Sequence, residues 1–379
     1  MKRFEALDSW RGIAACLVAF HHLARSVDSH LNGPGLIPNS YLFVDFFFVL
    51  SGFVIAANYE KRLAEGFSVW RFALLRFGRL YPLHLSMLLA LILLRLAHAA
   101  SGLGAPPPFQ PPLWSADTVV ASLLLVHSLH LFDFNPWNGP SWSISTEFYT
   151  YLLFAAAVAL SRRRIVLLLL PVAVASALAL WALVGSIGTT FDWGLIRCIF
   201  GFSVGAITWH VHRVGWLRSG SVLELTSVVL IVAFVCHAGN SSLSLAAPAV
   251  FALAVLVFAA EAGAVSRLLR APAWLWLGER SYSIYMVHFL VVWLLADCVK
   301  LLSLAQIELI AASENASRLW QNDVLFLIYI VLVLGVAAVS YRMIEVPARS
   351  WFIRRLAAPR ARQDAHIAMR TAPRPAVID

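Results

Sequence analysis

Charged residues are scarce in this sequence: Asp, Glu, Lys and Arg make up only 13% of 379 residues, against about 25% in soluble domains. Hydrophobic residues make up 60%, which is above the soluble range of about 45–50%. This composition excludes an ordinary water-soluble protein and predicts a polytopic membrane protein. In a membrane protein, an excess of basic residues, here a net charge of +9, indicates first which side faces the cytoplasm. Nucleic-acid binding is therefore not predicted.

Cysteine and metal-ligand patterns are equally sparse. Four cysteines stand singly in or beside apolar runs, without the spacing of a disulfide framework or a zinc site. His127 and His130 share a helical face, but no third ligand at metal spacing accompanies them, and no metal site is predicted. The two halves show neither a fixed repeat nor the inverted hydropathy symmetry of many transporters.

Apolar windows of about 20 residues predict an all-α fold with ten transmembrane helices. These spans are expected at 9–27, 40–58, 80–100, 142–160, 165–184, 193–211, 222–238, 244–261, 281–300 and 323–342. Residues 1–352 are expected to form one membrane domain, and residues 353–379 a basic, disordered cytoplasmic tail. Arg11 interrupts the first apolar run and no small-residue cleavage site follows, so this run is interpreted as a retained span.

An eleventh apolar run, at 117–132, is interpreted as a re-entrant or interfacial segment. It has 16 residues, too few for a full crossing at about 1.5 Å per residue, and proline-containing stretches flank it. Without this crossing, most basic clusters and both termini fall on one side of the membrane. The positive-inside rule identifies that side as cytoplasmic. The region around 101–141 is then expected to form a cavity wall.

Charged or titratable side chains deep in a span are functional candidates, because each charge costs at least about 2.5–3.5 kcal/mol to insert. Arg11 and His22 are 11 residues apart, which places both on one face of the first span, about 16 Å apart. Arg11 could reach the headgroups and His22 could make a packing contact, but the shared face favours function. His21 points about 100° away and is interpreted as structural.

Two arginines follow the second span at helical spacing. Arg76 and Arg79 are three residues apart, so their guanidinium groups are neighbours at the inner membrane boundary, where they could hold phosphates. The same residues also satisfy the positive-inside rule without any ligand. Spacing alone leaves both interpretations open.

Two further spans carry ionisable groups at membrane depth. Glu147 lies about 8 Å along the span that opens at Trp142, and Arg197 enters from the same side as a candidate salt-bridge partner. Gly201 and Gly205 follow Arg197 at small-xxx-small spacing and are expected to allow close helix packing.

The last two spans add three more candidates. Tyr285 and His288 share a face near the start of the ninth span, with His288 about 10 Å in. Glu345 lies at the inner end of the last span, where it is expected to pair with a cytoplasmic arginine.

In this order, the motifs resemble the integral-membrane acyltransferase-3 family, whose members O-acylate bacterial surface glycans, secreted polysaccharides and some secondary metabolites. The resemblance covers nearly the whole membrane region. It depends on Leu7 to Gly12 with His22 at the family's Arg-ten-His spacing, Val44 to Phe53, Arg76-x-x-Arg79, Trp142-Ser143 to Glu147, Leu277-Gly278 with Ser281 to His288, and Glu345 with Pro347. One departure is Thr146-Glu147, where the family usually has two consecutive acidic residues.

The resemblance implies acyl transfer from cytoplasmic acyl-coenzyme A to a hydroxyl of a saccharide or glycosylated acceptor. Acetyl-coenzyme A is the default donor by family frequency, and no permanently bound cofactor is implied. The motifs assign Arg76 and Arg79 to the coenzyme and identify Arg11 and His22 as the essential pair.

A mechanism follows as a hypothesis. His22, oriented or made more basic by Glu147, would remove the proton from the acceptor hydroxyl. Ser51, Tyr285 or His288, at the donor site, would donate a hydrogen bond to the developing oxyanion. Direct transfer and a covalent acyl-enzyme remain equally open.

Family members often carry a fused SGNH-type domain, whereas about 28 residues follow Trp351 here, so a stand-alone form in a bacterial inner membrane is expected. Two other function classes stand beside this one. A secondary transporter, proton-coupled in its simplest form, would use His22, Glu147, Arg197 and His288 as a relay or substrate site. An inactive scaffold is disfavoured because every motif residue is present.

Overall fold

The computed structural model describes residues 3–33, 35–101, 111–161, 164–215, 217, 219–304 and 316–356. Within these ranges the regular structure is entirely helical, which confirms the predicted all-α class. The α-helices are α1 (Glu5–Ala24), α2 (Phe43–Ile55), α3 (Lys61–Ala64), α4 (Val69–Ser101), α5 (Ala116–Leu123), α6 (Trp142–Ser161), α7 (Ile165–Leu183), α8 (Gly194–Val214), α9 (Ser221–Ala238), α10 (Ala247–Phe258), α11 (Ala264–Leu269), α12 (Pro272–Glu279), α13 (Ser281–Leu304), α14 (Ala316–Ser340) and α15 (Val346–Leu356). Residues 353–356 of the expected disordered tail form the end of α15, and residues 357–379 lie outside the described residues.

Eight segments of the described chain are long and apolar enough to cross a membrane. They contain α2, α4, α6, α7, α8, α9, α13 and α14, and each coincides with a predicted span. The two other predicted spans are also helical but fall short of that standard. α1 carries Glu5, Asp8 and Arg11 in its first two turns, and α10 with its preceding turn forms a helix of only 17 residues, Ser242–Phe258. The protein is therefore an integral membrane protein with multiple apolar helices.

The run at 117–132 does not form a transmembrane helix. Its helical part is α5, which has 8 residues and is about 12 Å long, and turns follow it. A hydrocarbon core of about 30 Å requires about 20 residues. The turns fold over the start of α6, where the five residues from Trp142 to Thr146 are all buried.

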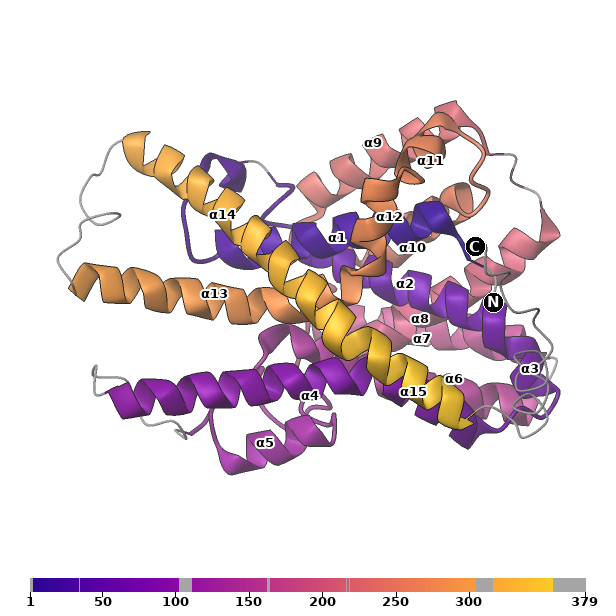
Figure 1. Ribbon diagram of the computed structural model, residues 1–379. Coiled ribbons are helices and arrows are strands. Elements are labelled where there is room, and N and C mark those ends of the chain that lie inside the picture. The colour runs from indigo at the N-terminus through magenta and orange to yellow at the C-terminus, as the bar shows by residue number, and fades with distance from the viewer. Residues whose placement is uncertain are drawn as a thin grey trace, which may run out of the picture.

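Figure 1 shows the N-terminus, α3 and α15 at one end of the molecule, while the far ends of α4, α13 and α14 project at the other. Two segments are π-helical: Ala56–Glu60 extends α2, and Tyr341–Glu345 joins α14 to α15. Such turns often mark functional sites because they redirect side chains within a helix.

Glycines bring α2 and α8 into backbone contact. A Cβ atom on Gly205 would overlap the carbonyl oxygen of Val49, and one on Gly52 would overlap that of Phe202. At Gly201, a Cβ atom would lie 2.9 Å from the Cβ of Phe48. The predicted packing role of Gly201 and Gly205 is confirmed.

We expect Gly205→Ala to lower the free energy of unfolding by about 1–3 kcal/mol, because the added methyl group meets backbone atoms that cannot rotate away. The matched control is Gly335→Ala in α14, where nothing lies within 4 Å of the added atom. That control should be neutral or slightly stabilising, since Ala has the higher helix propensity. Thermal unfolding in detergent measures both, and equal stabilities of the two variants would contradict the packing argument.

The buried charge on α8 has a different partner from the one predicted. Arg197 is 1% exposed and donates two hydrogen bonds to Asp45 of α2, from Nε at 2.9 Å and from Nη2 at 2.7 Å. Its Nη1 donates to the Thr189 carbonyl oxygen at 3.0 Å. The predicted pairing of Arg197 with Glu147 is therefore wrong, because Asp45 already occupies the guanidinium in a bidentate pair.

Candidate active site

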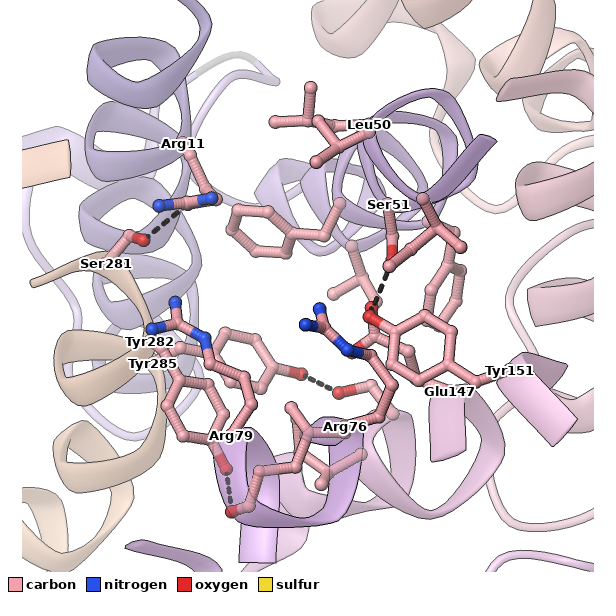
Figure 2. Close-up of a pocket in the computed structure, with 18 residues that line it drawn as sticks. Arg11, Leu50, Ser51, Arg76, Arg79, Glu147, Tyr151, Ser281, Tyr282 and Tyr285 are labelled. Atoms are coloured by element: carbon pink, nitrogen blue, oxygen red, sulfur yellow. Dashed lines mark hydrogen bonds between the residues drawn. The ribbon is translucent and has the colours of Figure 1, made fainter. Parts of the chain in front are cut away.

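A cavity of about 160 Å³ lies among α1, α2, α4, α6 and α13. Its lining includes the guanidinium groups of Arg11, Arg76 and Arg79 and one carboxylate, that of Glu147 (Figure 2). Three cations and one carboxylate around one apolar-walled space favour an anionic group in the ligand. The volume is below the roughly 300–1,000 Å³ of pockets that enclose drug-sized ligands, so a large ligand would place only part of itself here.

Arg11 reaches the cavity because α1 packs closely on α12. A Cβ atom on Gly12 would lie 2.7 Å from the backbone nitrogen of Gly278, a separation that only glycine permits. Arg11 then donates from Nε to Ser281 Oγ at 2.7 Å and from Nη2 to the Gly278 carbonyl at 3.2 Å, and it pairs with Asp8 at 3.4 Å. Arg11 therefore lies at the cavity, where the motif of α1 meets Gly278 and Ser281 from the later part of the chain.

Arg76 faces the cavity with a neutral protein partner. Its Nη2 donates to the hydroxyl of Tyr59 at 3.1 Å, and its guanidinium lies over the Tyr59 ring at 5.0 Å and the Phe72 ring at 5.9 Å. Its Nε is buried and has no hydrogen-bond partner in the part of the chain that the structure describes. These contacts fix the plane of the guanidinium and leave a donor unused.

Arg79, one turn further along α4, is held in an ion pair. Its Nη1 lies 2.5 Å from Oε1 of Glu345, whose side chain is 1% exposed. The other oxygen, Oε2, accepts a hydrogen bond from Ser283 at 2.9 Å. The expected pairing of Glu345 with an arginine is confirmed, and the π-helical turn presents this carboxylate to α4.

Glu147 lies with Tyr151 and Ser51. The Tyr151 hydroxyl donates to Oε1 of Glu147 at 2.6 Å and lies 2.7 Å from Ser51 Oγ (Figure 2). The predicted contact of Glu147 with His22 is wrong: the described residues show His22 hydrogen-bonded elsewhere. α6 starts inside the protein, beneath the turns that follow α5, and Glu147 lines the same cavity as Arg76 and Arg79.

His22 and His288 meet each other beside the cavity. His22 Nδ1 lies 3.3 Å from His288 Nε2 and 3.0 Å from the carbonyl oxygen of Val18, and the two rings are 4.8 Å apart. The Tyr329 hydroxyl lies near both helices, 3.1 Å from the Ala19 carbonyl and 3.3 Å from that of His288. The histidine pair therefore joins α1 and α13 at fixed geometry.

Tyr285 connects the cavity with the histidines. It lines the cavity, and its ring is 5.8 Å from that of His288 on the next turn of α13. Its hydroxyl lies 2.9 Å from Ser143 Oγ and 3.0 Å from the Pro140 carbonyl oxygen. Neither His22 nor His288 lines the cavity itself.

The region 101–141 contributes differently from its prediction. None of its described residues lines the cavity, so the expected cavity wall is wrong for this space. Instead the Pro140 carbonyl holds Tyr285, which does line it. Tyr59 and Tyr151 are partners of the charged groups that the sequence did not predict. Tyr151 was within reach of inference, since it stands four residues after Glu147 on one helix.

Residues 4–342 match the family model described as an acyltransferase domain, Acyl_transf_3. The chain belongs to the acyltransferase-3 family. It is 28% identical to acyltransferase MdmB of Streptomyces mycarofaciens over 320 residues, 76% of this chain and 79% of that protein. It is 34% identical to protein 2 in the picA locus of Rhizobium radiobacter over 166 residues, 41% of this chain and 82% of that protein. No solved structure matches the chain.

Family membership makes this acyltransferase-3 member an enzyme and favours acyl transfer over the transporter alternative. The geometry agrees, because the four residues of the alternative relay do not form one cluster. Arg197 is bound to Asp45, and Glu147 is bound to Tyr151. Only His22 and His288 of that set are in contact.

Proposed function

We propose that this membrane enzyme transfers an acyl group, acetyl by default, from acyl-coenzyme A to a hydroxyl of a saccharide or glycosylated acceptor. The observation that carries the proposal is the cavity lined by three guanidinium groups. Tyr285 lines this cavity and contacts His288, one member of the His22–His288 pair. Guanidinium groups suit the coenzyme phosphates, and an imidazole suits proton removal from a hydroxyl.

The orientation we propose has ten spans with both termini on the cytoplasmic side of a bacterial inner membrane. The support is the basic character of the end of the molecule that carries the N-terminus, α3 and α15 (Figure 1). Basic residues on these elements include Arg3 before α1, Lys61 and Arg62 in α3, and Arg354 and Arg355 in α15. The positive-inside rule places such an end in the cytoplasm, where acyl-coenzyme A is available.

Donor binding is proposed at Arg76 and Arg11, which face the cavity from opposite sides. Ser51 and Tyr285 line the same space, so their hydroxyl groups are the proposed donors to the thioester oxyanion. The small volume suits only part of the donor, so the rest of the coenzyme would lie outside it. His288 contacts His22 rather than the cavity, which makes it a partner of the base.

The tautomer of His22 follows from its contacts. The Val18 carbonyl oxygen can only accept, so the imidazole proton is on Nδ1 and the Nε2 lone pair is available. In the proposed step Nε2 takes the acceptor's hydroxyl proton while that oxygen bonds to the thioester carbonyl carbon. The carbon–sulfur bond then breaks, and the proton passes from the imidazolium to the departing coenzyme A thiolate.

His288 is expected to stabilise the imidazolium that forms on His22, since its Nε2 lone pair lies 3.3 Å from the protonated His22 Nδ1 and can share that proton with the Val18 carbonyl. Replacing His288 with Leu should lower kcat about 10–100-fold, the loss of one hydrogen bond to a charged group, with little change in the donor KM. His288→Gln keeps an acceptor and should retain more activity. Steady-state kinetics with acetyl-coenzyme A decides this, and an unchanged kcat in the Leu variant would contradict the role.

The function itself is tested by mass spectrometry of cell-surface glycans from strains with and without this protein. An ester group, acetyl in the first instance, should disappear from one saccharide when the protein is absent. Purified protein should then consume acetyl-coenzyme A only when that saccharide is added. Saccharides that stay identical in both strains, with no acceptor-dependent thiol release, would refute the proposal.

A further inference from the structure

The two arginines of α4 share a motif but differ in their surroundings. We infer that, of these two, only Arg76 binds the donor's phosphates, whereas Arg79 is a structural residue whose charge is committed to Glu345. This inference rests on the proposed function, because it concerns the same donor site. It also departs from the expectation that both arginines contact the coenzyme.

Arg79 already has an anion. Its guanidinium and the Glu345 carboxylate are 2.5 Å apart at a site where both side chains are largely buried, 20% and 1% exposed. A phosphate that displaced this carboxylate would leave it buried with one hydrogen bond, from Ser283. A buried charge that loses its partner is strongly unfavourable. A phosphate that did not displace it would meet a guanidinium whose charge is already neutralised.

Arg76 has no such anion. Within the described residues, none of its contacts is a carboxylate within 4 Å; Tyr59 and Phe72 hold its guanidinium in place. Its buried Nε has no hydrogen-bond partner among the described residues, and Arg76 lines the cavity. Glu147, which lines the same cavity, is hydrogen-bonded to Tyr151 instead. A pre-oriented guanidinium with a free edge is the geometry that binds a phosphate oxygen pair.

The partners of both arginines come from the π-helical turns. Tyr59 lies in the turn that extends α2, and Glu345 in the turn that joins α14 to α15. The start of α4 is therefore held from two sides, once through Arg76 and once through Arg79. Arg79 acts through this second attachment: it compensates the charge of the buried Glu345 carboxylate, which would otherwise repel a phosphate bound at Arg76.

Three variants of the full-length protein in nanodiscs separate the roles. They are R76Q, R79Q and the double variant R79Q/E345Q, with R79M/E345M as a second form of the double exchange. Each is assayed with acetyl-coenzyme A and with S-acetylpantetheine, which has the same thioester but no phosphate. Coenzyme A binding is measured separately by calorimetry, so that binding and transfer are read independently.

R76Q should raise the KM for acetyl-coenzyme A at least tenfold and leave the KM for S-acetylpantetheine unchanged, because only the first substrate carries phosphates. R79Q should lower the unfolding temperature and raise the acetyl-coenzyme A KM, since the bared Glu345 carboxylate repels phosphate. Removing that carboxylate in either double variant should return the KM to within threefold of the original protein.

Two results would overturn the inference: a double variant whose acetyl-coenzyme A KM stays tenfold raised, or an R76Q variant whose KM is unchanged. The first would make Arg79 a phosphate ligand in its own right. A protein that binds coenzyme A but transfers no acyl group would instead contradict the proposed function. In that case the variants still decide between the two arginines through their coenzyme A affinities.

Discussion

Replacing His22 with Ala is expected to lower kcat for acyl transfer by at least about 100-fold, while coenzyme A still binds. A positioned general base contributes about 10²–10⁴-fold, and the described part of the site offers no second imidazole in the same position. His288 touches Nδ1 of His22, the far side of the ring from the nitrogen proposed to act. The measurement is thiol release from acetyl-coenzyme A, with and without acceptor.

The matched control is His21→Ala, on the same helix. His21 is 8% exposed, and its ring packs 5.8 Å from that of Tyr41, away from the cavity. Its loss should affect stability more than kcat. The role of His22 is rejected if H22A turns over within threefold of the original protein, or if H21A loses as much activity at equal folding.

The second large effect is expected at the buried ion pair. Arg197→Met should lower the free energy of unfolding by about 3–5 kcal/mol, because Asp45 is 0% exposed and would keep an uncompensated charge. The double variant D45N/R197M removes both charges and should recover most of the loss. Thermal unfolding in detergent is the measurement.

Arg213→Met provides the control on the same helix, since Arg213 is exposed at the end of α8. It should change stability by no more than about 0.5 kcal/mol. Equal losses in R197M and R213M, or a double variant no better than R197M, would show that the pair does not stabilise the bundle.

The ion pair also bears on the active site. The Arg197 guanidinium lies 5.2 Å from the Trp142 ring, and Trp142 precedes Ser143, which contacts Tyr285. Loss of Arg197 therefore loosens the buried start of α6 and the hydroxyl groups that it carries into the cavity. Reduced activity in R197M at temperatures where the protein remains folded would follow from this connection.

Local sequence patterns predicted some positions and partners of the charged residues correctly and others wrongly. The face shared by Arg11 and His22 depends only on helix geometry, and the helix formed as predicted. The partner of Glu345 was predicted as an arginine, because a buried carboxylate at that depth needs a cation. The partner of Arg197 was predicted wrongly, because depth in a membrane does not specify which neighbouring helix is adjacent.

The sequence by itself determined the all-helical class, the positions of the apolar helices and the family, since each depends on composition, periodicity or motif order along one chain. Only the tertiary structure decided which charges meet: Arg197 with Asp45, Arg79 with Glu345, and His22 with His288. These contacts join residues 152 or more positions apart, and which helices meet is set by the shapes of their packing faces rather than by spacing along the chain. Glycine contacts bring the helices close enough for such pairs, and the burial that follows makes each pairing obligatory.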